Sequence, residues 1–234
     1  MKINYNIFFL IVIILHPIVH YGQDDTSINE SELWSSFKYK KKISKKVSLG
    51  FEGQLRINSN GKYFDESYYN QSFYEIETTY KVSKSFDFGI GYRGINKFDD
   101  QGNNQGSITY KRLHSFFKYG LDFKRLSFET RLQYQLKSRG NLDLSELENS
   151  YWRNKIEFTY NFKKWKVDPI FGSEFFIKNN LNIEDNFNKY RLFIGTKIKS
   201  KEFGDFNVKY ILERNVNTQN IKSTHVLKLA YSLD

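Results

Sequence analysis

Apolar and charged residues alternate along this chain in segments of about 10 to 12 residues, and the pattern recurs from Leu33 to the end. In the segment 47–57, Val47 and Leu49 fall on one face, whereas Glu52 and Arg56 fall on the other. Strand side chains point alternately to two faces, so such a segment forms a strand with an apolar and a charged face. Soluble strands usually have about 5 or 6 residues, whereas a tilted transmembrane strand needs about 9 to 11. The pattern therefore predicts an all-β fold, an antiparallel transmembrane β-barrel.

Eleven segments carry the alternation: 33–43, 47–57, 73–82, 86–96, 108–121, 126–137, 151–162, 165–177, 189–199, 206–216 and 223–233. Bacterial single-chain barrels have even strand numbers. We therefore expect about 10–12 strands: either one more strand lies between Gln23 and Glu32, or one of the eleven segments lies outside the wall, and 12 is the best estimate. Pro169 predicts a bulge or a weakly paired position, because proline cannot donate a hydrogen bond to the ladder.

The connections between segments alternate in length and in charge. The short ones, at 40–46, 81–85, 122–125, 163–166 and 199–205, hold 14 basic and 3 acidic residues. The longer ones, at 58–72, 97–107, 138–150, 178–188 and 217–222, hold 5 basic and 9 acidic residues. Short periplasmic turns alternating with longer external loops are typical of outer-membrane barrels. The basic rim is placed to meet anionic lipid headgroups, because Lys and Arg act within a Debye length of the surface.

The N-terminus has the features of a cleaved signal peptide. Lys2 precedes an apolar run from Ile7 to Leu15, which is shorter than the roughly 20 residues of a membrane-spanning helix. We expect cleavage after Gly22, so that 1–22 is a signal peptide and 23–234 is a single barrel domain in the outer membrane of a Gram-negative bacterium. The sequence contains no Cys, which argues against a lipoprotein and a disulfide framework.

Composition supports a membrane barrel. Aromatic residues make up 18% of the chain, yet the mean hydropathy is −0.62. A barrel with lipid outside and water or ion pairs inside needs both kinds of residue. The net charge of +10 would suggest nucleic-acid binding, but an exported chain does not meet nucleic acid. The expected partners are outer-membrane lipids and the outer-membrane assembly machinery, with the barrel itself a monomer.

Several segments resemble the family called domain of unknown function 2490: Leu33-Trp34, the first hairpin with Arg56, the stretch 190–197 and Leu229-Ala230-Tyr231. The resemblance covers nearly the whole mature chain and implies an outer-membrane barrel without an assigned activity. The last segment is also similar to the strand signal that the assembly machinery reads. It departs from that signal at Asp234, where an aromatic residue is usual.

Eleven charged residues fall on the inward phase and are our candidates for lumenal ion pairs: Glu52, Arg56, Glu75, Glu77, Arg93, Glu129, Arg131, Arg153, Glu157, Glu174 and Arg191. They could form a selectivity lining or ligand site. They could equally form an electrostatic core, which we favour because barrels near this strand number have little free lumen. Arg131 is expected to meet an acidic partner such as a cross-strand neighbour of Glu129, and Leu132 is expected to meet lipid.

No catalytic, metal or cofactor site is predicted. His114 lies on the inward phase and the adjacent Ser115 on the outward phase, so only His225 with Ser223 could form a Ser-His pair, and no third group or oxyanion hole accompanies it. The stretch 99–104 lacks the closing Glu of a calcium loop. The favoured function is a barrel of unknown ligand with a structural, surface-interaction or narrow-transport role. The alternatives are a lipid-modifying barrel enzyme and a soluble secreted β-sandwich that binds a partner.

Overall fold

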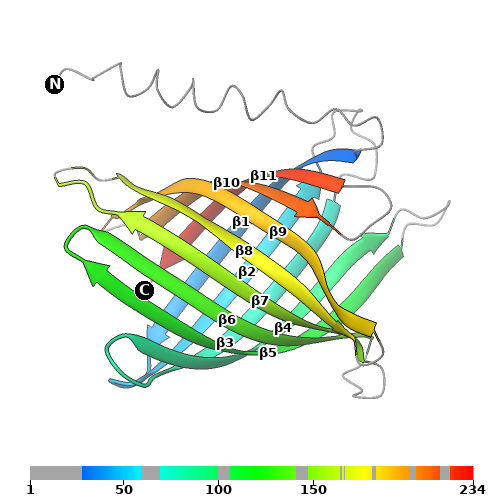
Figure 1. Ribbon diagram of the computed structural model, residues 1–234, viewed down its shortest axis with the longest axis horizontal. Coiled ribbons are helices and arrows are strands. Elements are labelled where there is room, and N and C mark those ends of the chain that lie inside the picture. Colours follow the sequence, from blue (N-terminus) through cyan, green and yellow to red (C-terminus); the bar gives the residue numbers. More distant parts are fainter. Residues whose placement is uncertain are drawn as a thin grey trace.

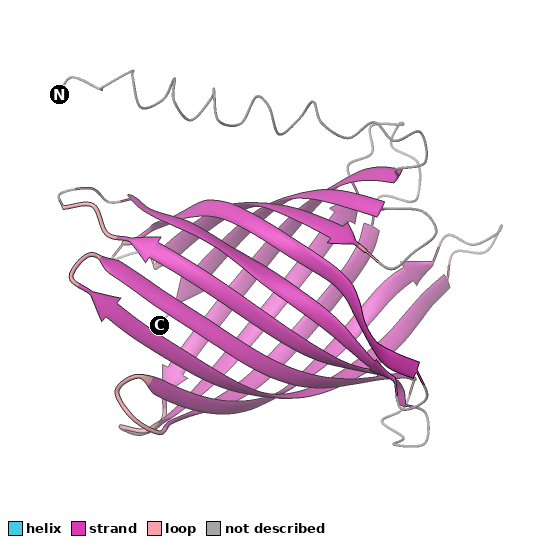
Figure 2. Ribbon diagram, in the orientation of Figure 1, coloured by secondary structure: helices cyan, strands magenta, loops and turns pink. Residues whose placement is uncertain are grey.

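The chain forms a single closed barrel of strands in the computed structural model (Figure 1). The structure describes residues 28–58, 69–99, 106–140, 147–163, 165, 167–180, 183–200, 204–216 and 222–233. Every regular element in these ranges is a strand (Figure 2). A helix long and apolar enough to span a bilayer is not found in this part of the chain. The expected signal peptide, 1–22, lies outside these ranges.

Eleven strands follow one another around the barrel: β1 (Ile28–Lys42), β2 (Val47–Asn58), β3 (Tyr69–Lys81), β4 (Phe86–Asp99), β5 (Gly106–Phe123), β6 (Leu126–Arg139), β7 (Leu147–Tyr160), β8 (Val167–Asn180), β9 (Ile183–Ile198), β10 (Asp205–Asn215) and β11 (Lys222–Leu233). Consecutive strands pair antiparallel. The all-β barrel expected from the alternation is therefore confirmed.

The barrel closes by parallel pairing of β1 with β11, from Ile28 opposite Lys222 to Tyr39 opposite Leu233. An odd number of antiparallel strands leaves the first and last pointing the same way, so the closing pair has to be parallel. The eleven segments of the sequence are these eleven strands, within the expected range of 10–12. A twelfth strand is not needed for closure, because β1 starts at Ile28 and uses part of the segment in which that strand was sought.

Two local features of β8 differ from the sequence expectation, one of them only in part. Pro169 pairs with Thr196 of β9 without a register shift, so the expected bulge is wrong, and the irregularities of β8 and β9 lie instead at Phe176/Ile177 and Lys178/Asn180. The pairing of β8 with β7 ends at Ile170, so Pro169 is paired on one side only, as expected of a weakly paired position. The long loop expected at 178–188 is also wrong, since β8 continues to Asn180 and β9 begins at Ile183. The β8–β9 hairpin therefore extends the wall where a loop was expected.

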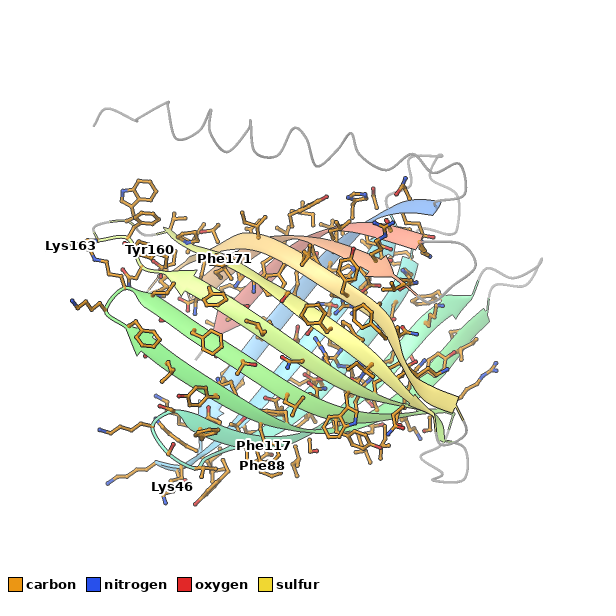
Figure 3. All side chains as sticks on the ribbon, viewed as in Figure 1. Lys46, Phe88, Phe117, Tyr160, Lys163 and Phe171 are labelled. Atoms are coloured by element: carbon orange, nitrogen blue, oxygen red, sulfur yellow. The ribbon has the colours of Figure 1, made fainter. Side chains whose placement is uncertain are left out.

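The apolar face of the strands points out of the barrel. Large apolar side chains such as Phe117 (59% exposed) and Ile90 (56% exposed) cover the outer surface. Many pair across neighbouring strands, as Phe88 does with Phe117, with ring centroids 5.2 Å apart on the outer wall (Figure 3). Polar side chains such as Gln135 (3% exposed) are buried inside. A closed barrel of this kind is not the two-sheet sandwich of our alternative, which is therefore wrong.

The short connections gather at one end of the barrel. Lys46, between β1 and β2, and Lys163, between β7 and β8, both lie at the left end of Figure 3. The turn between β5 and β6 belongs to the same end, because successive connections of an antiparallel meander alternate between the ends, and Lys124 adopts a positive φ of 51° there. Exposed lysines therefore crowd one rim, as the sequence indicates.

Candidate functional site: the charged lumen

A cavity of about 420 Å³ lies inside the barrel, and every strand contributes to its lining. Nine of the eleven ion-pair candidates line it: Glu52, Arg56, Glu75, Arg93, Glu129, Arg131, Arg153, Glu174 and Arg191. Glu77 and Glu157 lie outside the lining, but each binds a cation that belongs to it. The alternation thus brings side chains from strands far apart in the sequence to one interior space.

Glu174 on β8 is the centre of the most buried ion-pair network. Its Oε1 accepts a hydrogen bond from Nε of Arg153 at 2.6 Å, and its Oε2 accepts one from Nη1 of Arg191 at 2.9 Å. Arg191 also binds Glu213, which in turn accepts a hydrogen bond from Lys189 at 3.2 Å. Because Glu174 is only 4% exposed, these hydrogen bonds replace the water that its carboxylate loses on burial.

A second network joins β3 to β4 and β6. Arg93 donates to Oε2 of Glu75 at 2.6 Å, and Arg131 donates to Oε2 of Glu77 at 2.7 Å. The partner of Arg131 is therefore acidic, but it is not one of the cross-strand neighbours of Glu129, which corrects that expectation. β3 and β6 are not paired, so Arg131 reaches over β4 and β5, and its guanidinium lies 3.7 Å from the centroid of the Phe116 ring on β5.

Two glycines on β4 make room for this network. Gly91 faces His114 and Gly89 faces Phe116 across the β4–β5 pair. A Cβ atom at either glycine would collide with the opposing ring. Because these glycines have no side chains, both rings lie against the backbone of β4, and the guanidinium of Arg131 lies over the Phe116 ring.

Glu75, Glu77 and His114 form a cluster whose possible ligand atoms all lie within 4.8 Å of one another. Nε2 of His114 is 3.6 Å from Glu77, and both ring nitrogens are buried and have no hydrogen-bond partner in the described part of the chain. These three residues could offer ligands to a metal ion. However, the guanidiniums of Arg93 and Arg131 already balance the two carboxylates at the same oxygens. We interpret the cluster as an ion-pair network, because a divalent cation would have to displace both arginines.

The remaining candidate acids are bound by lysines that the sequence analysis did not single out. Glu52 lies 3.3 Å from Lys38 and 3.5 Å from Lys228. Glu157 lies 2.8 Å from Lys155 and 2.7 Å from Lys209. Glu129 lies 3.3 Å from Lys118 and is 42% exposed, which makes this pair the weaker kind. These lysines share the inward phase of their strands with the candidate residues, so the alternation in the sequence could have identified them as lumenal.

Two cavity-lining arginines lack a carboxylate partner among the residues that the structure describes. Arg56 donates to the amide oxygen of Gln54 at 2.9 Å and stacks over Trp34, with its guanidinium carbon 3.8 Å from the ring centroid. Arg112, which the sequence analysis missed, has a buried Nε without a hydrogen-bond partner. The lining as a whole contains 12 basic and 4 acidic side chains. Positive charge therefore remains uncompensated in the cavity.

His225 lies on the outer wall of β11. Its Nδ1 is 2.6 Å from the hydroxyl of Tyr210 on β10, whereas its chain neighbour Val226 points inward and is fully buried. The structure thus pairs His225 with a tyrosine on the apolar surface, rather than with the Ser223 that the sequence analysis considered.

Comparison with known proteins finds one relationship. The model of a family described as "Protein of unknown function (DUF2490)" matches residues 31–223. A search of curated proteins finds no match, and a search of solved structures finds none either.

Proposed function

Because the chain belongs to the DUF2490 family and folds as a closed barrel, we propose that it is an outer-membrane protein whose ion-paired lumen allows only narrow passage. The observation that carries this proposal is the reversed distribution of polarity. Rings such as Phe117 cover the outside, while Glu75, Glu174 and Arg191 are buried inside. A soluble barrel would expose its charges and bury its rings, whereas a lipid-facing barrel does the opposite.

The basic rim supports an orientation in the membrane. Exposed lysines of the short connections, such as Lys45 and Lys46, extend from one end of the barrel. Short turns face the periplasm in barrels of this type, where the lysines would contact anionic phospholipid headgroups. We propose a monomer, and the closed wall supports this because it offers no strand edge to which another copy could add by β-pairing.

The filled interior supports a narrow passage over a wide pore. Salt bridges of the buried Glu174 tie β8 to β7 and to β9, and a half-buried salt bridge joins β3 to β6 over β4 and β5. Large aromatic rings also point inward, among them Phe73, Phe116 and Phe176. Side chains held by several partners are expected to obstruct ions, so a role in wide, unselective diffusion does not fit this lumen.

Three measurements test the proposal. Fractionation should find the protein in the outer membrane, and mass spectrometry should find a mature N-terminus near Gln23. Planar-bilayer recording of the purified barrel should show small currents. Recovery of an intact Met1 form in the inner membrane would contradict the location, and large, stable open-channel currents would contradict the narrow lumen.

A further inference from the structure

We propose that the cavity is a binding site for a small polyanion, an inorganic or organic molecule with two or more phosphate or carboxylate charges. The site is a group of six cations that line the cavity, which we call the cation belt: Arg56, Arg93, Arg112, Arg153, Lys189 and Arg191. This inference rests on the proposed narrow lumen and adds the chemical class of the ligand.

Aromatic rings hold five cations of the belt together. Arg93 and Arg56 both lie over the Phe73 ring, at 3.9 and 5.8 Å from its centroid. Arg56 and Arg191 both lie over Trp34, at 3.8 and 5.1 Å.

Three cations at the other end of the belt lie over the Phe176 ring. Arg191, Lys189 and Arg153 lie 4.8, 4.9 and 5.2 Å from its centroid. Three inward rings thus space like charges at short intervals around one cavity. A ring face attracts a cation but carries no net charge, so it does not neutralise the belt.

Arg112 adds the sixth cation. It lies directly opposite Arg93 in the β4–β5 register, and both side chains line the cavity. Like charges in directly opposed positions destabilise a sheet. Arg93 is paired with Glu75, whereas the buried Nε of Arg112 has no hydrogen-bond partner among the described residues. A buried N–H donor of a charged group is costly to leave without an acceptor.

The carboxylates bound to the belt are fewer than its cations. Glu75 pairs with Arg93, and Glu174 and Glu213 pair with the other members. A fourth acid, Glu32, lies near the belt because it accepts a hydrogen bond from the indole of Trp34. Glu32 also accepts a hydrogen bond from Asn70 at 2.6 Å. Six cations against four acids leave two positive charges, and Arg56 and Arg112 are the two members of the belt that have no carboxylate partner among the described residues.

A polyanion satisfies this arrangement better than water or a single chloride. A guanidinium presents a planar fork of donors that matches the oxygens of phosphate and carboxylate. A molecule with two such groups could satisfy Arg56 and Arg112 together and cancel the excess charge. The cavity of about 420 Å³ sets the ligand class, since it has room for a small molecule but not for a polymer chain.

The test is calorimetric titration of the whole barrel, purified in detergent at low ionic strength, with pyrophosphate and with citrate. We expect saturable binding of at least one of them, with one molecule per barrel. Tighter binding of pyrophosphate would identify a phosphate ligand, and tighter binding of citrate a carboxylate ligand. Absence of saturable binding of either to a folded barrel would overturn the proposal.

Variants locate the binding. Arg112→Gln and Arg56→Gln should each weaken the affinity by about tenfold or more, since each removes a charge-assisted hydrogen bond. Arg125→Gln is the matched control, because it makes the same charge change at an exposed turn residue. Equal weakening by Arg125→Gln would show only general attraction of anions to a basic protein and would overturn the site.

Thermal melting separates a binding role of Arg112 from a structural one. Without polyanion, Arg112→Gln should melt at the same temperature as the parent or higher, because it removes a charge that has no carboxylate partner among the described residues and lies opposite Arg93. The polyanion should raise the melting temperature of the parent more than that of the variant. A variant that fails to fold would overturn the proposal. All these readouts use protein in detergent, so they are independent of the location and conductance that test the proposed function.

Discussion

Glu174→Gln tests whether the lumen is held together by buried ion pairs. The substitution keeps the size of the side chain but removes the charge that Arg153 and Arg191 share. Arg191 keeps Glu213, whereas Arg153 keeps the face of the Phe176 ring, at 5.2 Å, and no carboxylate among the described residues. The variant therefore leaves one lumenal guanidinium without a carboxylate.

The expected loss follows from the burial of the pair. Breaking a buried ion pair by removing one partner costs about 3–5 kcal/mol. Arg153 is 21% exposed, and water that reaches it lowers the cost, so we expect Glu174→Gln to reduce the free energy of unfolding by about 2–4 kcal/mol. Glu129→Gln is the matched control. Its carboxylate is 42% exposed, so the same substitution should cost less than about 1 kcal/mol.

Denaturant unfolding of the barrel in lipid vesicles, followed by tryptophan fluorescence, measures both variants. The double variant Glu174→Gln/Arg153→Gln should recover part of the loss, with a coupling energy of about 1–3 kcal/mol. If Glu174→Gln cost no more than Glu129→Gln and the double variant were additive, the lumen would be filled by water and free ions, and the reasoning on buried pairs would be refuted.

Three further predictions concern the lipid face, the wall and the rim. Leu132, which is 42% exposed on the outer face, should tolerate substitution by Phe, whereas Leu132→Arg should destabilise the barrel by about 2–4 kcal/mol if the residue lies at the bilayer midplane. Unfolding in lipid vesicles measures both variants, and a Leu132→Arg variant as stable as the parent would contradict the lipid-facing phase. Gly172→Ala should lower the free energy of unfolding by about 1–3 kcal/mol in the same assay, because the added Cβ would meet the carbonyl oxygen of Ile156 and the ring of Phe193. Gly120→Ala, whose nearest contact would be 3.9 Å, should be nearly neutral. Equal effects of the two substitutions would refute the close packing at β8. The double variant Lys45→Gln/Lys46→Gln should bind vesicles of anionic lipid more weakly by about 1 kcal/mol per charge, as measured by co-sedimentation. The difference from the parent should disappear at high salt. An effect that does not depend on salt would argue against contact with headgroups.

The sequence by itself determined the class of fold, the positions of most strands and the two faces of the wall. These properties are local, because side-chain direction in a strand repeats every two residues. Leu132 and Gln133 are neighbours in the chain, yet Leu132 is 42% exposed and Gln133 is 4% exposed. The same rule could have identified Arg112, which shares the phase of His114, and Phe73, which shares the phase of Glu75. An aromatic residue in phase with charges indicates an inward ring.

Only the tertiary structure decided how the barrel closes and which charges meet inside it. Glu77 and Arg131 are 54 positions apart, on strands that do not pair. Their contact depends on the register of each intervening strand pair and on the glycines of β4, which leave room for the rings of His114 and Phe116. The alternation within one strand contains none of this information. The parallel closure of β1 with β11 likewise depends on the strand count of the whole barrel. The excess of positive charge around the cavity appears only when every strand is in place, because each strand contributes only a few of the side chains that line it.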